Sequence, residues 1–329
     1  MNLLPFPDTP IFLSYHNRAF PFGVVQANAP EDITKWVCTK GVYCTFHPEK
    51  MNKFCFAVDD LWSLGEGLIS QQTLQIKKEY LELFNLDLLQ ILKTAIDNEW
   101  YIHGGYNEKH VPSKNSFNQR DFMHDFLVIG YDDKNFISVG YVDDGRFKRF
   151  EIPIPDFMKA ITETTDGRTN INLFRYNTGA IPEPNIKRMV EDLNKYISTA
   201  KYFENPKQKP YLHGIAACIR LKEFFLKEIE DGCTFVDRRY TLAFYEHKWI
   251  LAKLVESFLD DDEKEQYAKI TNRNLEKAKS IHMLGLKICL GGNTSSINRI
   301  TDLMNNIILE EIEYIPSLIE LLEKKYSII

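Results

Sequence analysis

The sequence predicts an α+β domain over residues 1–180, followed by a helical domain over residues 181–329. Helical and strand-like patterns alternate before residue 180, whereas the pattern is helical from Pro184 to the end of the chain. The length of 329 residues suits one large or two ordinary domains, and 44% hydrophobic with 26% charged residues is typical of a globular protein.

The first predicted helix begins near Ala29 and continues through "ITKWV". Pro30 suits the first turn, and the acidic residues after it stand where the helix dipole favours negative charge. Trp36 and Val37 continue the apolar spacing of a helix. The residues just before such a helix lie where its dipole stabilises an anion, so this place suits a thiolate nucleophile. The residue that stands there is Ala27.

The next segments predict one or two helices and then a run of strands. Residues 71–100 have a helical period. Four runs rich in Val, Ile, Phe and Tyr follow, separated by Asp, Asn and Gly as in a meander of hairpins: "WYIHGGY", "DFLVIGYDD", "NFISVGYVDD" and "RFKRFEIPI". The stretch "DGRTNINLFRYN" at 166–177 is expected to add one more strand.

The C-terminal half predicts helices with one clear break. One helix is expected from about Asp237 to Leu259, because apolar residues recur there three or four apart. In "GLKICLGGNTSS", Gly291 and Gly292 are expected to end a helix, and Thr294 or Ser295 to cap the next one.

Charge and cysteine usage exclude several classes of protein. A net charge of −6 argues against a nucleic-acid-binding protein. No stretch approaches 18 apolar residues, and "MNLLPFPDTP" lacks the features of a signal peptide, so no membrane partner is expected. The six cysteines form no C-x-x-C pair and no zinc-binding spacing, which predicts free thiols in a reducing cytoplasm. We therefore expect a cytoplasmic protein without a metal or another cofactor.

A histidine and an aspartate form the main candidate for chemistry. A two-residue turn inside "DDKN" would place His124 directly opposite Asp143 on an adjacent antiparallel strand. A carboxylate in that position orients an imidazole and stabilises its charged form. Asp144 is the reserve candidate if the register is shifted, whereas Asp125 is expected on the opposite face of the strand. A strand-end histidine and an Asp doublet in a turn also occur without any catalytic role.

These segments resemble a known family. "YIHGGYNEKHVP" through "FMHDFLVIGYDD" resembles the N-terminal domain of the butirosin biosynthesis protein H family, which has a papain-like fold. "VDRRYTLAFYEHKWILAKLVESF" resembles the helical part of clostridial members of that group, and the nearest likeness is to amide-forming enzymes of polythioamide biosynthesis. In this papain-like order a cysteine at the head of the first helix precedes a histidine and an aspartate on adjacent strands.

The resemblance implies thiol-dependent acyl transfer in secondary-metabolite biosynthesis. A cysteine would take an acyl chain from the thioester of a phosphopantetheinyl carrier protein and pass it to an amine, expected to be a diamine. The catalytic cysteine maps to Ala27, the histidine to His124 and the aspartate to Asp143. Because alanine cannot be the nucleophile, either the chain carries an engineered substitution or it is a native binding protein for an acyl peptide or metabolite. A cysteine peptidase is a third interpretation.

Overall fold

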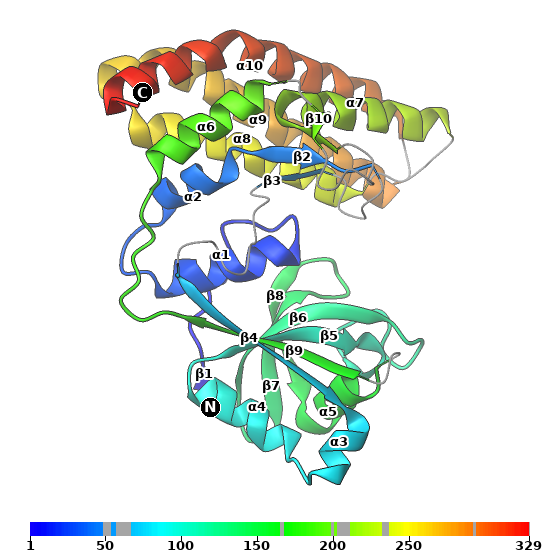
Figure 1. Ribbon diagram of the computed structural model, residues 1–329. Coiled ribbons are helices and arrows are strands. Elements are labelled where there is room, and N and C mark those ends of the chain that lie inside the picture. Colours follow the sequence, from blue (N-terminus) through cyan, green and yellow to red (C-terminus); the bar gives the residue numbers. More distant parts are fainter. Residues whose placement is uncertain are drawn as a thin grey trace. The chain divides into compact units, whose positions relative to one another are not determined.

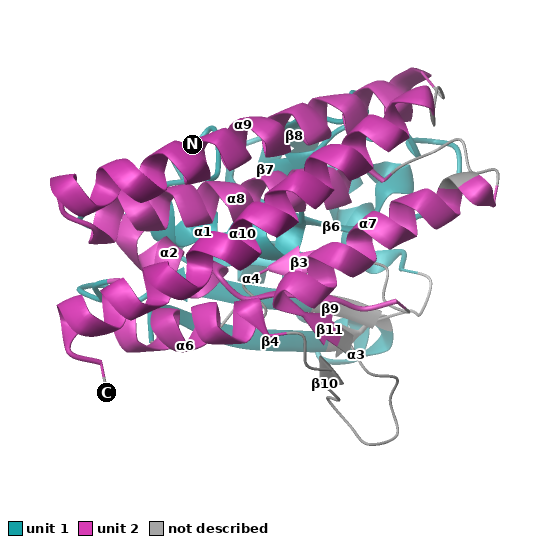
Figure 2. Ribbon diagram, turned by 90° about the horizontal axis from the view of Figure 1, so that it is seen from above, with its two compact units in different colours: residues 1–31, 60–181 teal, residues 32–59, 182–329 magenta. Residues whose placement is uncertain are grey.

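The computed structural model divides the chain into two compact units (Figures 1 and 2). Unit 1 comprises Met1–Glu31 and Asp60–Ile181, and unit 2 comprises Asp32–Asp59 and Pro182–Ile329. The α+β class, with antiparallel sheets and a helical C-terminal region, is confirmed. The structure describes residues 1–48, 54–56, 67–164, 168–198, 201–202, 211–231, 237–291 and 294–328.

Unit 1 is built on an antiparallel sheet in the order β4-β9-β5-β6-β7-β8, with β1 paired to the end of β6 (Figure 1). The predicted strands between residues 100 and 177 are confirmed, because each pairs with a neighbour. The strands are β1 (Asn2–Leu3), β4 (Ile69–Lys77), β5 (Tyr101–Asn107), β6 (Met123–Tyr131), β7 (Asn135–Tyr141), β8 (Phe147–Pro153) and β9 (Arg168–Tyr176).

The predicted helical segment 71–100 is partly wrong. Its first residues belong to strand β4, and the helices α3 (Lys78–Leu83) and α4 (Leu88–Asp97) follow. Nine residues of β4 pair with β9, and this tertiary pairing overrides a local apolar spacing that also fits a helix. Helix α4 begins where the Asp87 side chain accepts a hydrogen bond from the Gln90 N–H.

Helices α1 (His16–Asn28) and α5 (Ile154–Thr162) pack against the strands of unit 1. In α5, Phe157 is fully buried and its ring packs on Phe126, Phe136 and Tyr106. The predicted helix through "ITKWV" is present as α2 (Thr34–Gly41), but it begins at Thr34 and not near Ala29, and it is not the first helix, because α1 precedes it and ends at Asn28. Helix α1 contains Pro21 and is buried almost all round, so it has neither the composition nor the amphipathic period of a recognisable helix.

Unit 2 combines a small antiparallel sheet, in the order β10-β11-β2-β3, with long helices (Figure 2). Helix α9 contacts α8 and α10, and α10 also contacts α6 and α7. The elements are α2 (Thr34–Gly41), β2 (Cys44–Phe46), β3 (Phe54–Phe56), α6 (Ile186–Ile197), β10 (Lys201–Tyr202), β11 (Tyr211–His213), α7 (Gly214–Glu230), α8 (Arg238–Phe258), α9 (Asp261–Gly291), η2 (Thr294–Ser296) and α10 (Ile297–Tyr326).

The predicted helix from Asp237 to Leu259 is confirmed as α8, and the predicted helix end at Gly291 is confirmed as the end of α9. Gly292 lies outside the described residues. The residue that precedes α10 is Ser296, one position beyond the predicted cap, and its side chain makes no capping hydrogen bond; the predicted caps Thr294 and Ser295 lie with it in the short helix η2.

The two units do not follow the linear division at residue 180. Residues 32–59 belong with the C-terminal half, because β2 pairs with β11 and α2 packs on α8 and α6. Such pairing joins residues far apart in the sequence, and a local pattern cannot reveal it.

The described part of the chain contains no helix with the length and apolar character needed to cross a membrane. Its five cysteines are free thiols. Cys38, Cys44, Cys55 and Cys218 are buried, whereas Cys289 is partly exposed.

A buried ion pair lies in unit 2. The Lys248 ammonium and the Glu311 carboxylate are 2.8 Å apart, and each side chain is only 1% exposed. The Tyr196 hydroxyl donates to the same Glu311 oxygen at 2.6 Å and accepts from Lys248 at 2.8 Å.

We expect Glu311→Leu to lower the free energy of unfolding by about 3–5 kcal/mol, because it leaves the Lys248 ammonium buried without its counter-charge. The triple variant Glu311→Leu, Lys248→Met, Tyr196→Phe leaves no polar member of the group and should recover most of that loss. Urea denaturation measures both. A triple variant as unstable as the single variant would contradict the charge-based reason.

His282 belongs to α9, and its side chain contacts residues of α8. Its Nδ1 is 3.2 Å from the Thr241 hydroxyl, and its ring stacks on Tyr245. The helices approach closely here, since a Cβ added at Gly285 would lie 2.8 Å from the Thr241 hydroxyl oxygen. Burial, followed by the charge of Arg238, lowers the pKa of His282 from 6.5 to about 4.

This shift predicts an acid-sensitive contribution to stability. The unfolded chain binds a proton at His282 below about pH 6.5, whereas the folded chain does so only near pH 4, so stability falls as the pH falls through this window. His282→Gln cannot be protonated there and should show a shallower loss of unfolding free energy from pH 7 to 4. Urea titrations at several pH values test this, and parallel profiles for the two proteins would contradict it.

Candidate functional site

The candidate site of unit 1 begins at the head of α1. Tyr15 is the N-cap residue, and His16 is the first helical residue. The His16 ring is stacked against Phe20, with centroids 4.7 Å apart, and against Tyr141, at 5.3 Å. Its side chain is 7% exposed, and its Nε2 accepts a long hydrogen bond of 3.4 Å from the Tyr141 N–H. These contacts fix the ring in one orientation.

Asp125 on β6 joins two histidines. Its Oδ1 lies 2.9 Å from His16 Nδ1, and its Oδ2 lies 3.0 Å from His103 Nε2. Asp125 pairs with Gly105, and His103 of β5 pairs with Leu127, so Asp125 and His103 are diagonal neighbours on one face of the sheet. The carboxylate therefore ties the head of α1 to two strands.

A second carboxylate orients His124. Glu108 is not part of strand β5 but is the first residue of the short helix η1 (Glu108–His110). Its Oε1 lies 2.9 Å from His124 Nδ1. The Lys114 ammonium lies 3.2 Å from the same oxygen, and both Glu108 and Lys114 are almost fully buried. The His124 side chain is 39% exposed. It is therefore held at Nδ1 by Glu108, while its other nitrogen, Nε2, lies 3.7 Å from Asp125 Oδ1.

The charges of the cluster follow from these contacts. Burial alone would raise the pKa of Asp125, but hydrogen bonds from His103 and His16 hold it far below its usual range. Burial lowers the pKa of His16, which favours the neutral imidazole at neutral pH. Burial would raise the pKa of Glu108, but its contacts with His124 and Lys114 lower it. Both carboxylates are therefore ionised at neutral pH.

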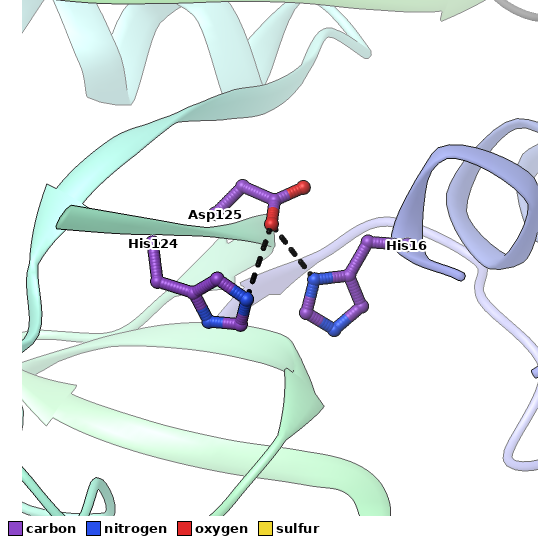
Figure 3. Close-up of side chains that lie close together, drawn as sticks. All are labelled: His16, His124 and Asp125. Atoms are coloured by element: carbon purple, nitrogen blue, oxygen red, sulfur yellow. Dashed lines mark hydrogen bonds and ion pairs between the residues drawn. The ribbon is translucent and has the colours of Figure 1, made fainter. Parts of the chain in front are cut away.

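Donor atoms of His16, His124 and Asp125 converge in this site (Figure 3). One such atom from each residue lies within 4.8 Å of the others. His124 Nε2 is 3.7 Å from Asp125 Oδ1, and the rings of His16 and His124 have centroids 5.2 Å apart. Two imidazoles and a carboxylate in this arrangement can transfer protons or hold a metal ion.

The predicted pairing of His124 with Asp143 is wrong. The register starts as predicted, with Tyr131 opposite Phe136, but an irregularity between Val128 and Gly130 shifts it by one residue. The Asp143 carboxylate accepts from the N–H of Asp144, so it belongs to the turn. The reserve candidate Asp144 binds the Arg146 N–H and the Lys148 ammonium instead. The carboxylate that orients His124 is Glu108, which the sequence did not single out.

The predicted position of Ala27 before a helix is also wrong. Ala27 lies in the last turn of α1, which is the negative end of the helix dipole and disfavours a thiolate. It is eleven residues beyond His16, about 16 Å along the helix axis. A side chain at position 27 therefore cannot reach His124 alongside His16. The residue at the head of the first helix, facing His124, is His16.

Sequence reasoning also missed Asp125 as the centre of the site. A signal was available in the alternation of β5 and β6, which places His103 and Asp125 on one face. His16 had no comparable signal, because α1 does not resemble a helix in sequence.

No protein-family model matches the chain, and no curated protein sequence matches it. The site is therefore interpreted from its own geometry.

Proposed function

We propose that unit 1 carries an acyl-transfer centre of papain-like type, in which His124 is the general base. The observation that carries the proposal is the His124–Glu108 contact of 2.9 Å beside the head of α1. A buried carboxylate on Nδ1 fixes the tautomer, so Nε2 has the lone pair that accepts a proton. The 39% exposure of His124 gives a substrate access to that nitrogen.

The order of the elements supports the papain-like type. The head of the first helix precedes the strand that carries His124, which is the papain-like order, although the residue at that head is His16 and not Ala27, to which the resemblance assigned the nucleophile. An imidazole stands where a papain-like enzyme has its thiol. The chemistry we propose therefore proceeds by direct transfer and needs no acyl-enzyme.

In this reaction an amine attacks the carbonyl carbon of a thioester. The new C–N bond forms as His124 Nε2 accepts the amine proton, and the C–S bond then breaks. The proton passes from His124 to the departing thiolate, which leaves as a thiol, so His124 returns to its starting state. The positive end of the α1 dipole stabilises the negative charge of the tetrahedral intermediate.

The substrates we propose are an acyl thioester of a phosphopantetheinyl carrier protein and an amine, with a diamine as the preferred acceptor. They follow from the resemblance of "FMHDFLVIGYDD" and its neighbours to the butirosin biosynthesis protein H family. The protein would thus form an amide in secondary-metabolite biosynthesis in the cytoplasm.

Amide formation from model thioesters tests this function. The full chain is incubated with 1,3-diaminopropane and the benzoyl or hexanoyl thioester of N-acetylcysteamine or of a carrier protein. We expect the thiol to be released and the monoamide to form, and mass spectrometry detects the monoamide. His124→Ala should lower the rate about 100-fold or more, because it removes the general base.

Two further variants make the test specific. Glu108→Gln should lower the rate by about tenfold or more, because an orienting carboxylate is lost while the base remains. Asp143→Asn, which alters only a turn in this structure, should leave the rate unchanged. No thiol release above the enzyme-free rate from any of these thioesters would refute the proposal, and so would full activity of His124→Ala.

A further inference from the structure

We propose that His16, His124 and Asp125 form a binding site for a divalent transition-metal ion of the zinc type. The sequence predicted no metal, because its cysteines lack zinc spacing and the two histidines are more than a hundred residues apart. The inference stands on the geometry of the side chains in unit 1 and does not rest on acyl transfer.

The spacing of the donor atoms suits a shared ion. Asp125 Oδ1 lies 2.9 Å from His16 Nδ1 and 3.7 Å from His124 Nε2. Zinc binds nitrogen and oxygen ligands at about 2.0–2.2 Å, which places neighbouring ligands about 3.3–3.6 Å apart in a tetrahedral site. The two measured separations bracket that range, so small side-chain shifts suffice to bring all three donors onto one ion.

The contact between His124 and Asp125 also leaves room for an ion. With Glu108 on its Nδ1, His124 presents Nε2 toward Asp125 Oδ1 at 3.7 Å. This separation is too long for a hydrogen bond, so an ion between the two atoms would join groups that do not otherwise bond.

Two of the three proposed ligands, His124 and Asp125, have an outer partner of the kind that metal sites use. Glu108 accepts from His124 Nδ1, which is the carboxylate–histidine–metal arrangement, and Lys114 fixes Glu108 in turn. His103 holds the second oxygen of Asp125 at 3.0 Å, which leaves Oδ1 for the ion. These contacts preorganise the site before any ion binds.

Binding has a cost at His16. An ion on His16 Nδ1 replaces the direct contact of that nitrogen with Asp125 and moves the ring proton to Nε2, which faces the Tyr141 N–H. The hydrogen bond that Tyr141 loses is 3.4 Å long and therefore weak. Two carboxylates, Asp125 and Glu108, lie beside the single ammonium of Lys114, and this excess of negative charge favours a dication.

The ligand set indicates the class of ion and its role. Two imidazoles and one carboxylate are typical of zinc and non-haem iron and disfavour magnesium and calcium. Three protein ligands leave a coordination position for water or a substrate oxygen, as in catalytic zinc sites. Among the residues that the structure describes, only this group of histidine, cysteine and acidic side chains has donor atoms close enough to share an ion.

Zinc binding to the metal-free full chain tests the site. Competition with a chromogenic chelator should show one ion per chain with a Kd of about 1 µM or lower. His124→Gln and Asp125→Asn should each weaken binding by about 100-fold or more, and Glu108→Gln by about 10–100-fold. Asp143→Asn, at an exposed turn carboxylate, should bind as the wild type does. No stoichiometric binding by the wild type, or unchanged binding by His124→Gln, would overturn the proposal.

A second measurement needs no variant and therefore holds even if a substitution impairs folding. Cobalt(II) replaces zinc, and the proton NMR spectrum of the wild type is recorded in water and in deuterium oxide. We expect two exchangeable, paramagnetically shifted imidazole N–H signals, one from His16 and one from His124. A spectrum without such signals at full cobalt occupancy would overturn the assignment of the ligands.

The outcome separates this proposal from the proposed function. Zinc binding without amide formation retains the metal site and refutes acyl transfer by His124. Amide formation by a protein that binds no zinc retains acyl transfer and refutes the metal site.

Discussion

The candidate site of unit 1 depends on the carboxylate of Asp125. It is the only side chain of the described cluster that touches His16 and His103 and also lies beside His124. One oxygen fixes the head of α1, and the other fixes a neighbouring strand. Its side chain is only 33% exposed, so the ionised carboxylate would raise the free energy of the folded state without its histidine partners. The histidines in turn take their orientation from this charge.

Local pairing explains which part of the fold could be predicted. The strands β6, β7 and β8 follow one another with short turns, and their alternation and turn residues are visible in the sequence. Helix α8 was predictable because one of its faces is apolar over its whole length. The assignment of residues 32–59 to unit 2 could not be predicted, because it rests on β2 pairing with the distant strand β11.

The site was less predictable than the sheet that carries it. His124 was identified, but its partner was not, because one irregularity between Val128 and Gly130 shifts the register by a residue. A shift of one residue changes which side chains face each other, so the turn alone could not fix the contact. Glu108 comes from the short helix η1 and not from the paired strand. His16 was missed because a buried helix with an internal proline has no amphipathic period.

The identity of the residue at the head of α1 determines which chemistry the site can support. The positive end of a helix stabilises a thiolate but destabilises a protonated imidazole, and burial acts on His16 in the same direction. A histidine at that position is therefore kept neutral, with its ring nitrogens able to accept a proton or bind a metal ion. A covalent route through a thiol has no residue to carry it there. The two proposals use Nε2 of His124 differently, as the general base in direct acyl transfer and as a ligand in the metal site, and only the metal site also uses the His16 ring.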